Sequence, residues 1–288
     1  MKNLQDAKKK YEEVEIPMEL NNIVKNSIKE AKRKQKRRKP VKQWGIGLAA
    51  AAALFITSVN VSPALAQSLS SVPMLGSIVQ VVTVQEIKIA EDNFNADIST
   101  PNVTGLENKE LEQMLNDKYI AENEALYDNF QKKMEEMKAA GGGNYAVNAD
   151  YEVLTDTDSL LVIQNRNLEI MASGSESATY DNIDKEHELY ITLPSLFKDD
   201  SYVQVISAYI KEEMKKQMAN EEVVYFLEED GDGFASILPD QQFYITADNK
   251  LIISFDEYEV APGYMGMVTF EIPTEVIRDI LISDYYIK

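Results

Sequence analysis

A run of nineteen uncharged residues, at positions 44–62, divides the hydrophobic pattern of this chain into two unequal parts. The run is rich in Ala, Leu, Ile and Phe, and a dense basic cluster at 32–42 precedes it. About 20 apolar residues in a helix are enough to cross a bilayer. Because basic flanks stay on the cytoplasmic side, the pattern predicts one transmembrane helix at 44–66. The protein is then a single-pass type II protein of the cell membrane, with its N-terminus cytoplasmic and its C-terminus extracellular.

A candidate cleavage site directly follows the apolar run. Ala64 and Ala66 form the small-x-small pattern that signal peptidase accepts, and Pro63 ends the helix before it. We therefore expect a cut between Ala66 and Gln67. Two interpretations remain open, a signal peptide that is removed at once and a membrane anchor with a latent cleavage site. The 43 residues ahead of the run favour the anchor.

The segment before the apolar run predicts two short amphipathic helices. Apolar residues recur at helical spacing, first at Leu4, Ala7, Tyr11 and Val14, and then, after Pro17, at Leu20, Ile23, Val24 and Ile28. So short a segment cannot bury both stripes by itself, so we expect a cytoplasmic partner protein to cover the second one. The inner membrane surface is the alternative. Nucleic acid is less favoured, because topology already explains the basic cluster.

Beyond the apolar run, mixed strand and helix patterns predict an α+β ectodomain of two modules, with antiparallel strands and packed helices. The predicted parts are a linker at 67–78, a first module at 79–183 and a second module at 184–288. In the first module we expect strands at 79–89, 145–155 and 160–171, a helix at 106–140 and a polar loop at 172–177. In the second we expect a strand at 188–193, a helix at 200–218, a hairpin at 243–255, a strand at 267–272 and a final helix from 273.

The net charge of −19 conceals two parts of opposite sign. Residues 1–43 hold 14 Lys and Arg against 6 Asp and Glu, which gives +8, whereas residues 67–288 hold 15 against 42, which gives −27. An outer part this acidic repels anionic polymers and attracts cationic proteins over a distance, more weakly as salt is added. The chain has no cysteine, so packing alone must hold the outer part together.

Few residues in the chain could carry catalysis. One His and no Cys exclude Cys/His zinc sites, cysteine nucleophiles and sites that need two imidazoles. His187 is not accompanied by the GxSxG motif or a comparable motif of serine hydrolases. The acidic run at 228–233 resembles part of a calcium loop, but Phe234 stands where a ligand is required. We therefore expect a binding protein, with no catalytic residues, no metal and no cofactor.

Residues 243–273, FYITADNKLIISFDEYEVAPGYMGMVTFEIP, resemble the C-terminal module DUF3298, with its A-P loop and a Gly before the last strand. Residues 79–179 resemble the PdaC-like module DUF4163. Together with the basic N-terminal helices and the A-x-A site, the whole chain resembles the anti-sigma-V factors, a family of lysozyme-sensing anti-sigma proteins.

The resemblance implies a chain that holds an extracytoplasmic-function sigma factor at the membrane. Lysozyme binding outside would lead to cleavage by signal peptidase and then by an intramembrane protease, which releases the sigma factor. The same outer modules also occur beside polysaccharide deacetylase domains. A sensor of another ligand and an enzyme that modifies wall polysaccharide therefore remain alternatives.

One loop of the second module is suited to contact such a ligand. Proline fixes φ, glycine lets the chain turn, and the tyrosine that follows is a rigid amphipathic anchor. We expect the central lysozyme contacts at Pro262, Gly263, Tyr264, Ser173 and Ser175. The neighbouring carboxylates should mainly set the association rate and its salt dependence, and they are Asp256, Glu257 and Glu259. The alternative is that Tyr264 packs under the sheet as a corner residue.

Overall fold

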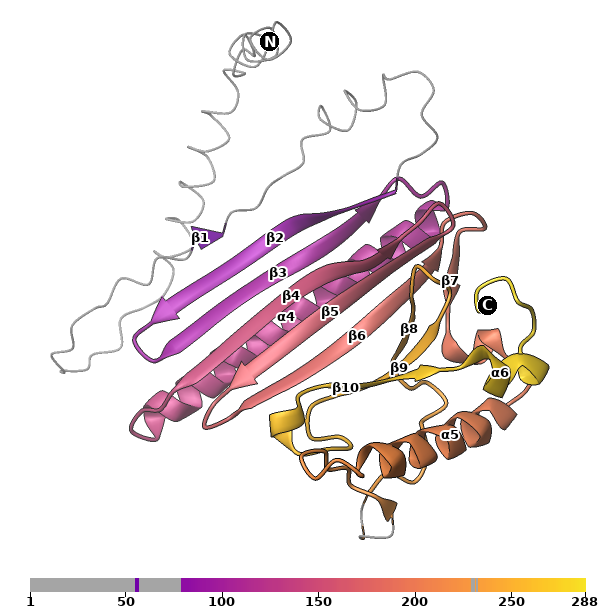
Figure 1. Ribbon diagram of the computed structural model, residues 1–288. Helices are drawn as coiled ribbons and strands as arrows, with labels where there is room; N and C mark the ends of the chain where they lie inside the picture. Colours follow the sequence, from indigo (N-terminus) through magenta and orange to yellow (C-terminus); the bar gives the residue numbers. More distant parts are fainter. Residues whose placement is uncertain (1–54, 57–78, 229–230, 232) are drawn as a thin grey trace, which may run out of the picture. The chain divides into compact units, whose positions relative to one another are not determined.

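The computed structural model describes residues 55–56, 79–228, 231 and 233–288 (Figure 1). They form a mixed α+β structure, which confirms the predicted class. Its larger sheet has seven strands in the order of the chain. These strands are β1 (Phe55–Ile56), β2 (Gln80–Glu91), β3 (Phe94–Thr104), β4 (Tyr145–Asp156), β5 (Leu160–Ile170), β6 (Gly174–Asp184) and β7 (Leu189–Ile191).

Most of the predicted N-terminal features lie outside the described residues. This holds for the amphipathic helices, for the cleavage site and for all of the 44–66 segment except Phe55–Ile56. These two residues form β1, which pairs antiparallel with Lys88 and Ile87 of β2. Within the described ranges, no helix is both long enough and apolar enough to span a membrane.

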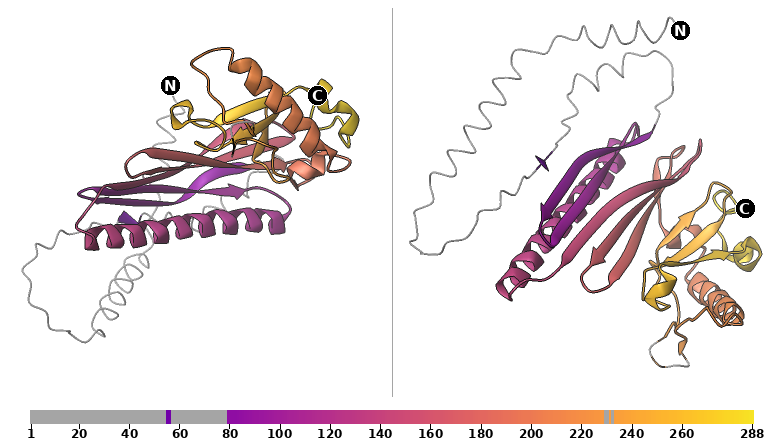
Figure 2. Two further views of the ribbon diagram at one scale, coloured as in Figure 1. Left: turned by 90° about the horizontal axis from the view of Figure 1, so that it is seen from below. Right: turned by 60° about the vertical axis from the view of Figure 1, so that its left-hand side comes forward.

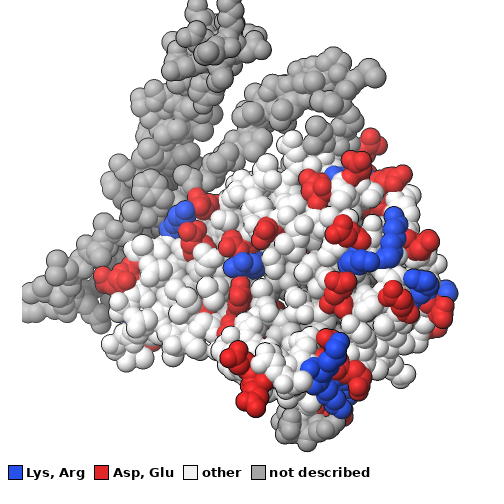
Figure 3. All heavy atoms as spheres, in the orientation of Figure 1, with Lys and Arg blue, Asp and Glu red and all other residues white. Residues whose placement is uncertain are grey.

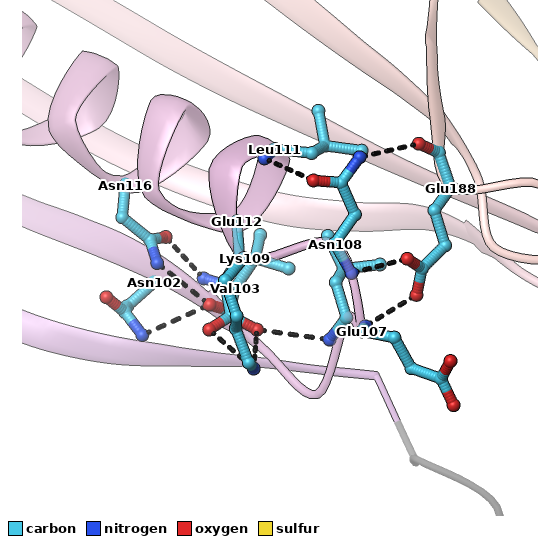
Figure 4. Close-up of polar contacts among 10 residues, drawn as sticks. Asn102, Val103, Glu107, Asn108, Lys109, Leu111, Glu112, Asn116 and Glu188 are labelled. Atoms are coloured by element: carbon cyan, nitrogen blue, oxygen red, sulfur yellow. Dashed lines mark hydrogen bonds and ion pairs between the residues drawn. The ribbon is translucent and has the colours of Figure 1, made fainter.

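Helix α4 (Lys109–Ala139) connects β3 to β4, and these two strands are parallel, whereas the other neighbours are antiparallel. Its N-terminal N–H groups have side-chain acceptors (Figure 4). The Asn108 side chain accepts from the N–H of Leu111 at 3.1 Å, and the Glu188 carboxylate accepts from the N–H groups of Glu107 and Asn108. A capped and acidic first turn stabilises a helix start. The predicted helix at 106–140 is confirmed.

Asparagines of α4 replace a missing strand beside β3. The pairing of β3 with β4 ends at Ile98. Beyond it, the Asn123 amide donates to the carbonyl of Ser99 at 3.1 Å, and Asn116 bonds both the N–H and the carbonyl of Val103, at 2.7 and 2.9 Å (Figure 4). Buried backbone groups need partners. These two side chains therefore let β3 continue where its neighbour has diverged.

The apolar stripe of α4 packs over two separate clusters on one face of the sheet. Leu115 and Tyr119 join residues of β3, β5 and β6, whereas Phe130 and Met134 join residues of β2, β3 and β4. Met114, although apolar and next to Leu115, is instead 49% exposed. The left view of Figure 2 shows α4 on one side of the sheet and the C-terminal elements on the other.

The C-terminal elements build a third core around a second, three-stranded sheet of order β10-β9-β8. Helix α5 packs against β10 and the short helix α6. The elements are η1 (Leu193–Leu196), α5 (Ser201–Gln217), β8 (Phe243–Ile245), β9 (Leu251–Phe255), η3 (Gly263–Met265), β10 (Val268–Ile272), α6 (Thr274–Ile277) and η4 (Arg278–Ile280). The predicted hairpin and the α5 helix are confirmed.

Two predicted elements are wrong in extent. The predicted polar loop at 172–177 is mostly strand, because β6 begins at Gly174 and pairs with β5 through Ser175 and beyond. The final helix predicted from 273 is a four-residue α6 followed by the 3-10 turn η4. The predicted boundary between the modules falls at the end of β6, and β7 beyond it extends the same sheet.

The edge of β6 is satisfied by side chains from the C-terminal elements. Three alternate N–H groups each donate to a side chain, Glu176 to Glu257 (2.8 Å), Ala178 to Asp256 (3.0 Å) and Tyr180 to Gln242 (3.2 Å). The Asn182 amide continues the row, bonding the carbonyl of Phe243 and the N–H of Ile245, both at 3.0 Å. These contacts fix β8 and the β9–β10 loop against β6.

Candidate binding site at the β9–β10 loop

The loop between β9 and β10 is held at its base and free at its tip. Val260 and Ala261 are buried, and the carbonyl of Val260 accepts from the N–H of Phe226 at 2.8 Å. Pro262, with φ of −60°, then starts the 3-10 turn η3, which ends at Gly266 with a φ of +64°. A residue other than glycine is strained at that angle. The tip of the loop therefore has a defined conformation.

Tyr264 stands at this tip with 69% of its surface exposed. Its hydroxyl donates to the carbonyl of Glu222 at 3.2 Å. An open hollow of about 610 Å³ lies beside it, lined also by Asn220, Val223 and Met265. The alternative that Tyr264 packs under the sheet is wrong, and the ring is available to a ligand.

Gly263 leaves room for the side chain of Tyr258. A Cβ atom at position 263 would lie 2.3 Å from Cζ of the Tyr258 ring. Tyr258 itself has a φ of +70°, an uncommon backbone conformation for a tyrosine, and its hydroxyl lies 3.4 Å from the carbonyl of Gly174. The absence of a side chain at Gly263 thus allows Tyr258 to pack against the loop. From the sequence, we expected this glycine to let the chain turn.

The structure brings the two predicted segments of the site together. The backbone N–H of Glu257 donates to the carbonyl of Glu176 at 2.9 Å, and the Glu257 carboxylate accepts from the N–H of Glu176 at 2.8 Å. Ser173, directly before β6, and Ser175, at its start, are both exposed. These serines therefore lie next to the β9–β10 loop although they are about 80 positions away in the chain.

The three carboxylates that we expect to set the association rate also accept hydrogen bonds that stabilise the loop. Asp256 and Glu257 accept from β6, and Glu259 accepts from the N–H of Asp256 at 2.8 Å and from Gln241 at 3.3 Å. Burial raises the pKa of Asp256, against the hydrogen bond from Ala178 that lowers it. Their predicted long-range effect on a cationic ligand stays a prediction. Figure 3 shows that the acidic side chains are spread over this face and do not form one patch.

Three exposed apolar residues that were not predicted as part of the site lie beside the loop. They are Ile170 and Met171 at the end of β5, exposed by 43% and 49%, and Tyr258, exposed by 48%. Ile170 pairs with Gly174, whose carbonyl lies against the Tyr258 hydroxyl. Exposed apolar side chains gathered near one aromatic tip are typical of protein-binding surfaces. A strand pattern alone could not separate these residues from core residues.

His187, the single histidine, belongs to a different region. Its Nδ1 lies 2.8 Å from a carboxylate oxygen of buried Asp184, which also accepts from the Tyr286 hydroxyl at 2.6 Å. This hydrogen bond and the charge of Asp184 raise the pKa of His187. Burial raises the pKa of Asp184, but the hydrogen bonds from Tyr286, His187 and Glu186 together hold it below its usual value. The hydrogen bond from Tyr286 to Asp184 connects the C-terminal segment to the end of β6.

We expect the contribution of His187 to stability to depend on pH. Since its folded pKa lies above the ordinary 6.5, the ion pair with Asp184 stabilises the fold fully below about pH 6.5. That contribution is lost as the pH rises through the raised pKa. Urea unfolding of residues 67–288 and of His187→Gln, near pH 5.5 and near pH 8.5, should show the larger difference at the lower pH. An equal difference at both pH values would contradict this.

Comparison with known proteins decides the family. Over 291 aligned residues, the chain is 43% identical to the anti-sigma-V factor RsiV of Bacillus subtilis (strain 168), an alignment that covers 100% of this chain and 99% of that protein. The chain belongs to the anti-sigma-V factor family. The resemblance stated from the sequence is thereby confirmed. An anti-sigma-V factor is a regulator, and this chain is not an enzyme.

Family models match two parts of this anti-sigma-V family member. Residues 194–275 match DUF3298, a protein family of unknown function, as the sequence predicted. Residues 36–132 match DUF4179, a domain of unknown function that here begins in the basic cluster and ends within α4. The sequence had suggested DUF4163 for residues 79–179. That assignment stays a prediction.

Two solved structures of DUF3298 proteins share the fold. One, from Bacteroides fragilis NCTC 9343, has a TM-score of 0.50 and 19% identity, and covers 73% of this chain and 96% of that one. The other, from Pseudomonas aeruginosa PAO1, has a TM-score of 0.50 and 13% identity, and covers 75% of this chain and 100% of that one. At these identities the likeness is one of fold alone.

Proposed function

We propose that this protein is a membrane-anchored anti-sigma factor that holds an extracytoplasmic-function sigma factor in the cytoplasm and senses lysozyme outside. The 43% identity along the whole chain to an anti-sigma-V factor is the observation that carries the proposal. The basic cluster at 32–42 and the apolar run at 44–62 support the anchor and its orientation. The N-terminus is then cytoplasmic and the C-terminus extracellular.

The sigma factor binds the stripe formed by Leu20, Ile23, Val24 and Ile28. We expect Ile23→Asp with Val24→Asp to weaken this complex by about 100-fold or more, because two carboxylates would be buried against an apolar surface. A sigma-dependent reporter should then be active without any ligand. The matched control places two carboxylates on the opposite side of the helix, with Asn22→Asp and Asn26→Asp. A silent reporter, with the variant still present in the membrane fraction, would contradict the assignment.

Lysozyme binds the site around the β9–β10 loop, at Tyr264, Pro262 and Gly263, with Ser173 and Ser175 beside them. The exposure of Tyr264 and the −27 charge of residues 67–288 support a cationic protein ligand. A sensor of another ligand is the alternative. Calorimetry and surface plasmon resonance of residues 67–288 with lysozyme at low salt separate the two, because an absence of binding in both would exclude lysozyme as the ligand.

Ligand binding exposes the site at Ala64, Ala66 and Gln67 to signal peptidase, and an intramembrane protease then releases the sigma factor. Small side chains at positions 64 and 66 support the choice of bond. We expect cells treated with lysozyme to yield an outer fragment whose N-terminal residue is Gln67, and Ala66→Trp to prevent it. An N-terminus elsewhere, or the same fragment from the variant, would contradict this step.

A further inference from the structure

A groove of about 390 Å³, lined by both polar and apolar side chains, runs beside the middle of α4 and is distinct from the β9–β10 loop site. It lies where the apolar stripe of the helix is only partly buried, at Leu126 and Tyr127. Tyr119 belongs to one buried cluster and Phe130 to another, and no residue between them is fully buried. In that interval the wall of the groove is formed by Glu122, Asn123, Ala125, Leu126 and Asn129 of the helix.

The floor of the groove is a polar part of the sheet. Leu161 and Ile163 of β5 are buried under α4, and the next alternate positions on the same face are Asn165 and Asn167. They pair across to Thr179 and Ser177 of β6, and all four residues line the groove. Cross-strand partners have side chains about 5 Å apart. The face of the sheet therefore changes from apolar to amide and hydroxyl groups at the groove.

Two ion pairs mark the ends of this interval of α4. Lys118 bonds Asp181 at 2.6 Å, and Lys133 bonds Glu169 at 2.8 Å. The two lysines are 15 positions apart on α4, which is about 22 Å along a helix. Arg166, which also borders the groove, lies 3.1 Å from Glu176. These cations are already neutralised by carboxylates, so the groove offers little to an anionic ligand.

Two side-chain atoms of residues that line the groove, Asn167 Oδ1 and Arg166 Nε, have no hydrogen-bond partner in the described chain. The side-chain carbonyl oxygen of Asn167 is buried and accepts no hydrogen bond. An unsatisfied buried acceptor of this kind destabilises the fold. Apolar residues at positions 165 and 167 would instead have joined the two buried clusters. A local loss of stability of this sort is expected at functional sites.

We propose that this groove binds a neutral polyhydroxylated ligand, such as an uncharged glycan. The amides of Asn123 and Asn165 already donate within the protein. The Asn129 amide and the hydroxyls of Ser177 and Thr179 are left to donate and accept, which matches the hydroxyl groups of a sugar. An extended peptide fits less well, because β5 is already paired on both sides and offers no strand edge. A volume of about 390 Å³ is within the usual range of ligand sites.

The test measures binding of uncharged trisaccharides to the full-length chain. The protein is kept in a zwitterionic detergent without a sugar headgroup, so that the detergent does not compete. Calorimetry uses the β-1,4-linked trimer of N-acetylglucosamine and the β-1,4-linked trimer of glucose as probes. Saturable binding of either supports the groove, and their difference tells whether the acetamido group is recognised.

Two variants locate the site and two controls match them. Asn167→Leu replaces an amide in the floor of the groove with an apolar side chain and Ser177→Tyr fills the groove, and each should lower the affinity at least tenfold. Asn148→Leu, an exposed position of β4 between two buried residues, and Thr269→Tyr, an exposed position of β10, should leave it unchanged. Circular dichroism checks that each variant is folded.

The proposal would be overturned by an absence of saturable binding to the wild-type chain. Folded Asn167→Leu and Ser177→Tyr variants that bind as well as the wild type would overturn it too, as would equal losses in the two controls. None of these outcomes depends on whether the chain binds lysozyme or a sigma factor, because the probes are small sugars and the groove is separate from Tyr264.

Discussion

Replacing Tyr264 with alanine in residues 67–288 is expected to weaken lysozyme binding by about 2 kcal/mol or more, roughly 30-fold. The ring is 69% exposed, yet its base is fixed by buried Val260 and Ala261 and by the turn that begins at Pro262. A rigid aromatic side chain loses little entropy on binding. The loss should therefore appear mainly as faster dissociation. The three cores of the described chain lie within residues 79–287, so the truncated protein retains them.

Matched variants separate the ring from other effects of the change. Tyr264→Phe keeps the ring and removes only the hydroxyl contact with Glu222, so most of the affinity should remain. Tyr285→Ala removes another partly exposed tyrosine, which contacts Glu186 and not the loop, and should not alter binding. Calorimetry and surface plasmon resonance would measure affinity and dissociation. Unchanged affinity in a folded Tyr264→Ala protein would exclude the anchor.

Local periodicity was enough to predict α4, α5 and the β8–β9 hairpin. These elements carry apolar residues at regular spacing, and turn residues such as Gly141 and Asn249 mark their ends. Such information lies within a few residues of each position. The predicted exposed tip at Tyr264 likewise depended only on the neighbouring proline and glycine.

The strands β3 and β6 were not predicted because distant residues satisfy their edges. β3 contains Pro101 and asparagines, which usually indicate a turn, and side chains of α4 complete its hydrogen bonding. β6 begins within the serine-rich segment GSES and receives its acceptors from Asp256 and Glu257, about 80 positions later. No local pattern reports contacts made at that separation.

The candidate sites divide in the same way. The sequence could point to Pro262 and Tyr264, but the contact of Tyr258 with Gly263 and the exposure of Met171 depend on how β6 and the loop meet. The groove beside α4 could not be predicted from the sequence either. Asn165 and Asn167 alternate with other residues in a strand, which is also what a solvated face looks like.

Asp181 of β6 connects that strand to α4 through a buried polar network. It is fully buried, and its carboxylate accepts from the Lys118 amine at 2.6 Å, from the Tyr190 hydroxyl at 2.9 Å and from the Asn165 amide at 3.2 Å. Removing one partner of such a network leaves the others without an acceptor in a low-dielectric interior. Because Lys118 is 32% exposed, water can recover part of that loss.

We therefore expect Asp181→Ala to lower the free energy of unfolding of residues 67–288 by about 3 kcal/mol, at the lower end of the range for broken buried pairs. The midpoint of thermal unfolding should fall by about 6 °C or more. Asp181→Asn keeps an acceptor for Tyr190 and should cost less. Asp97→Ala removes an exposed carboxylate 3.7 Å from Lys88 and should change stability by less than about 0.5 kcal/mol. Circular dichroism on heating and in urea would measure all three, and an Asp181→Ala protein as stable as Asp97→Ala would show that the network does not hold α4 to the sheet.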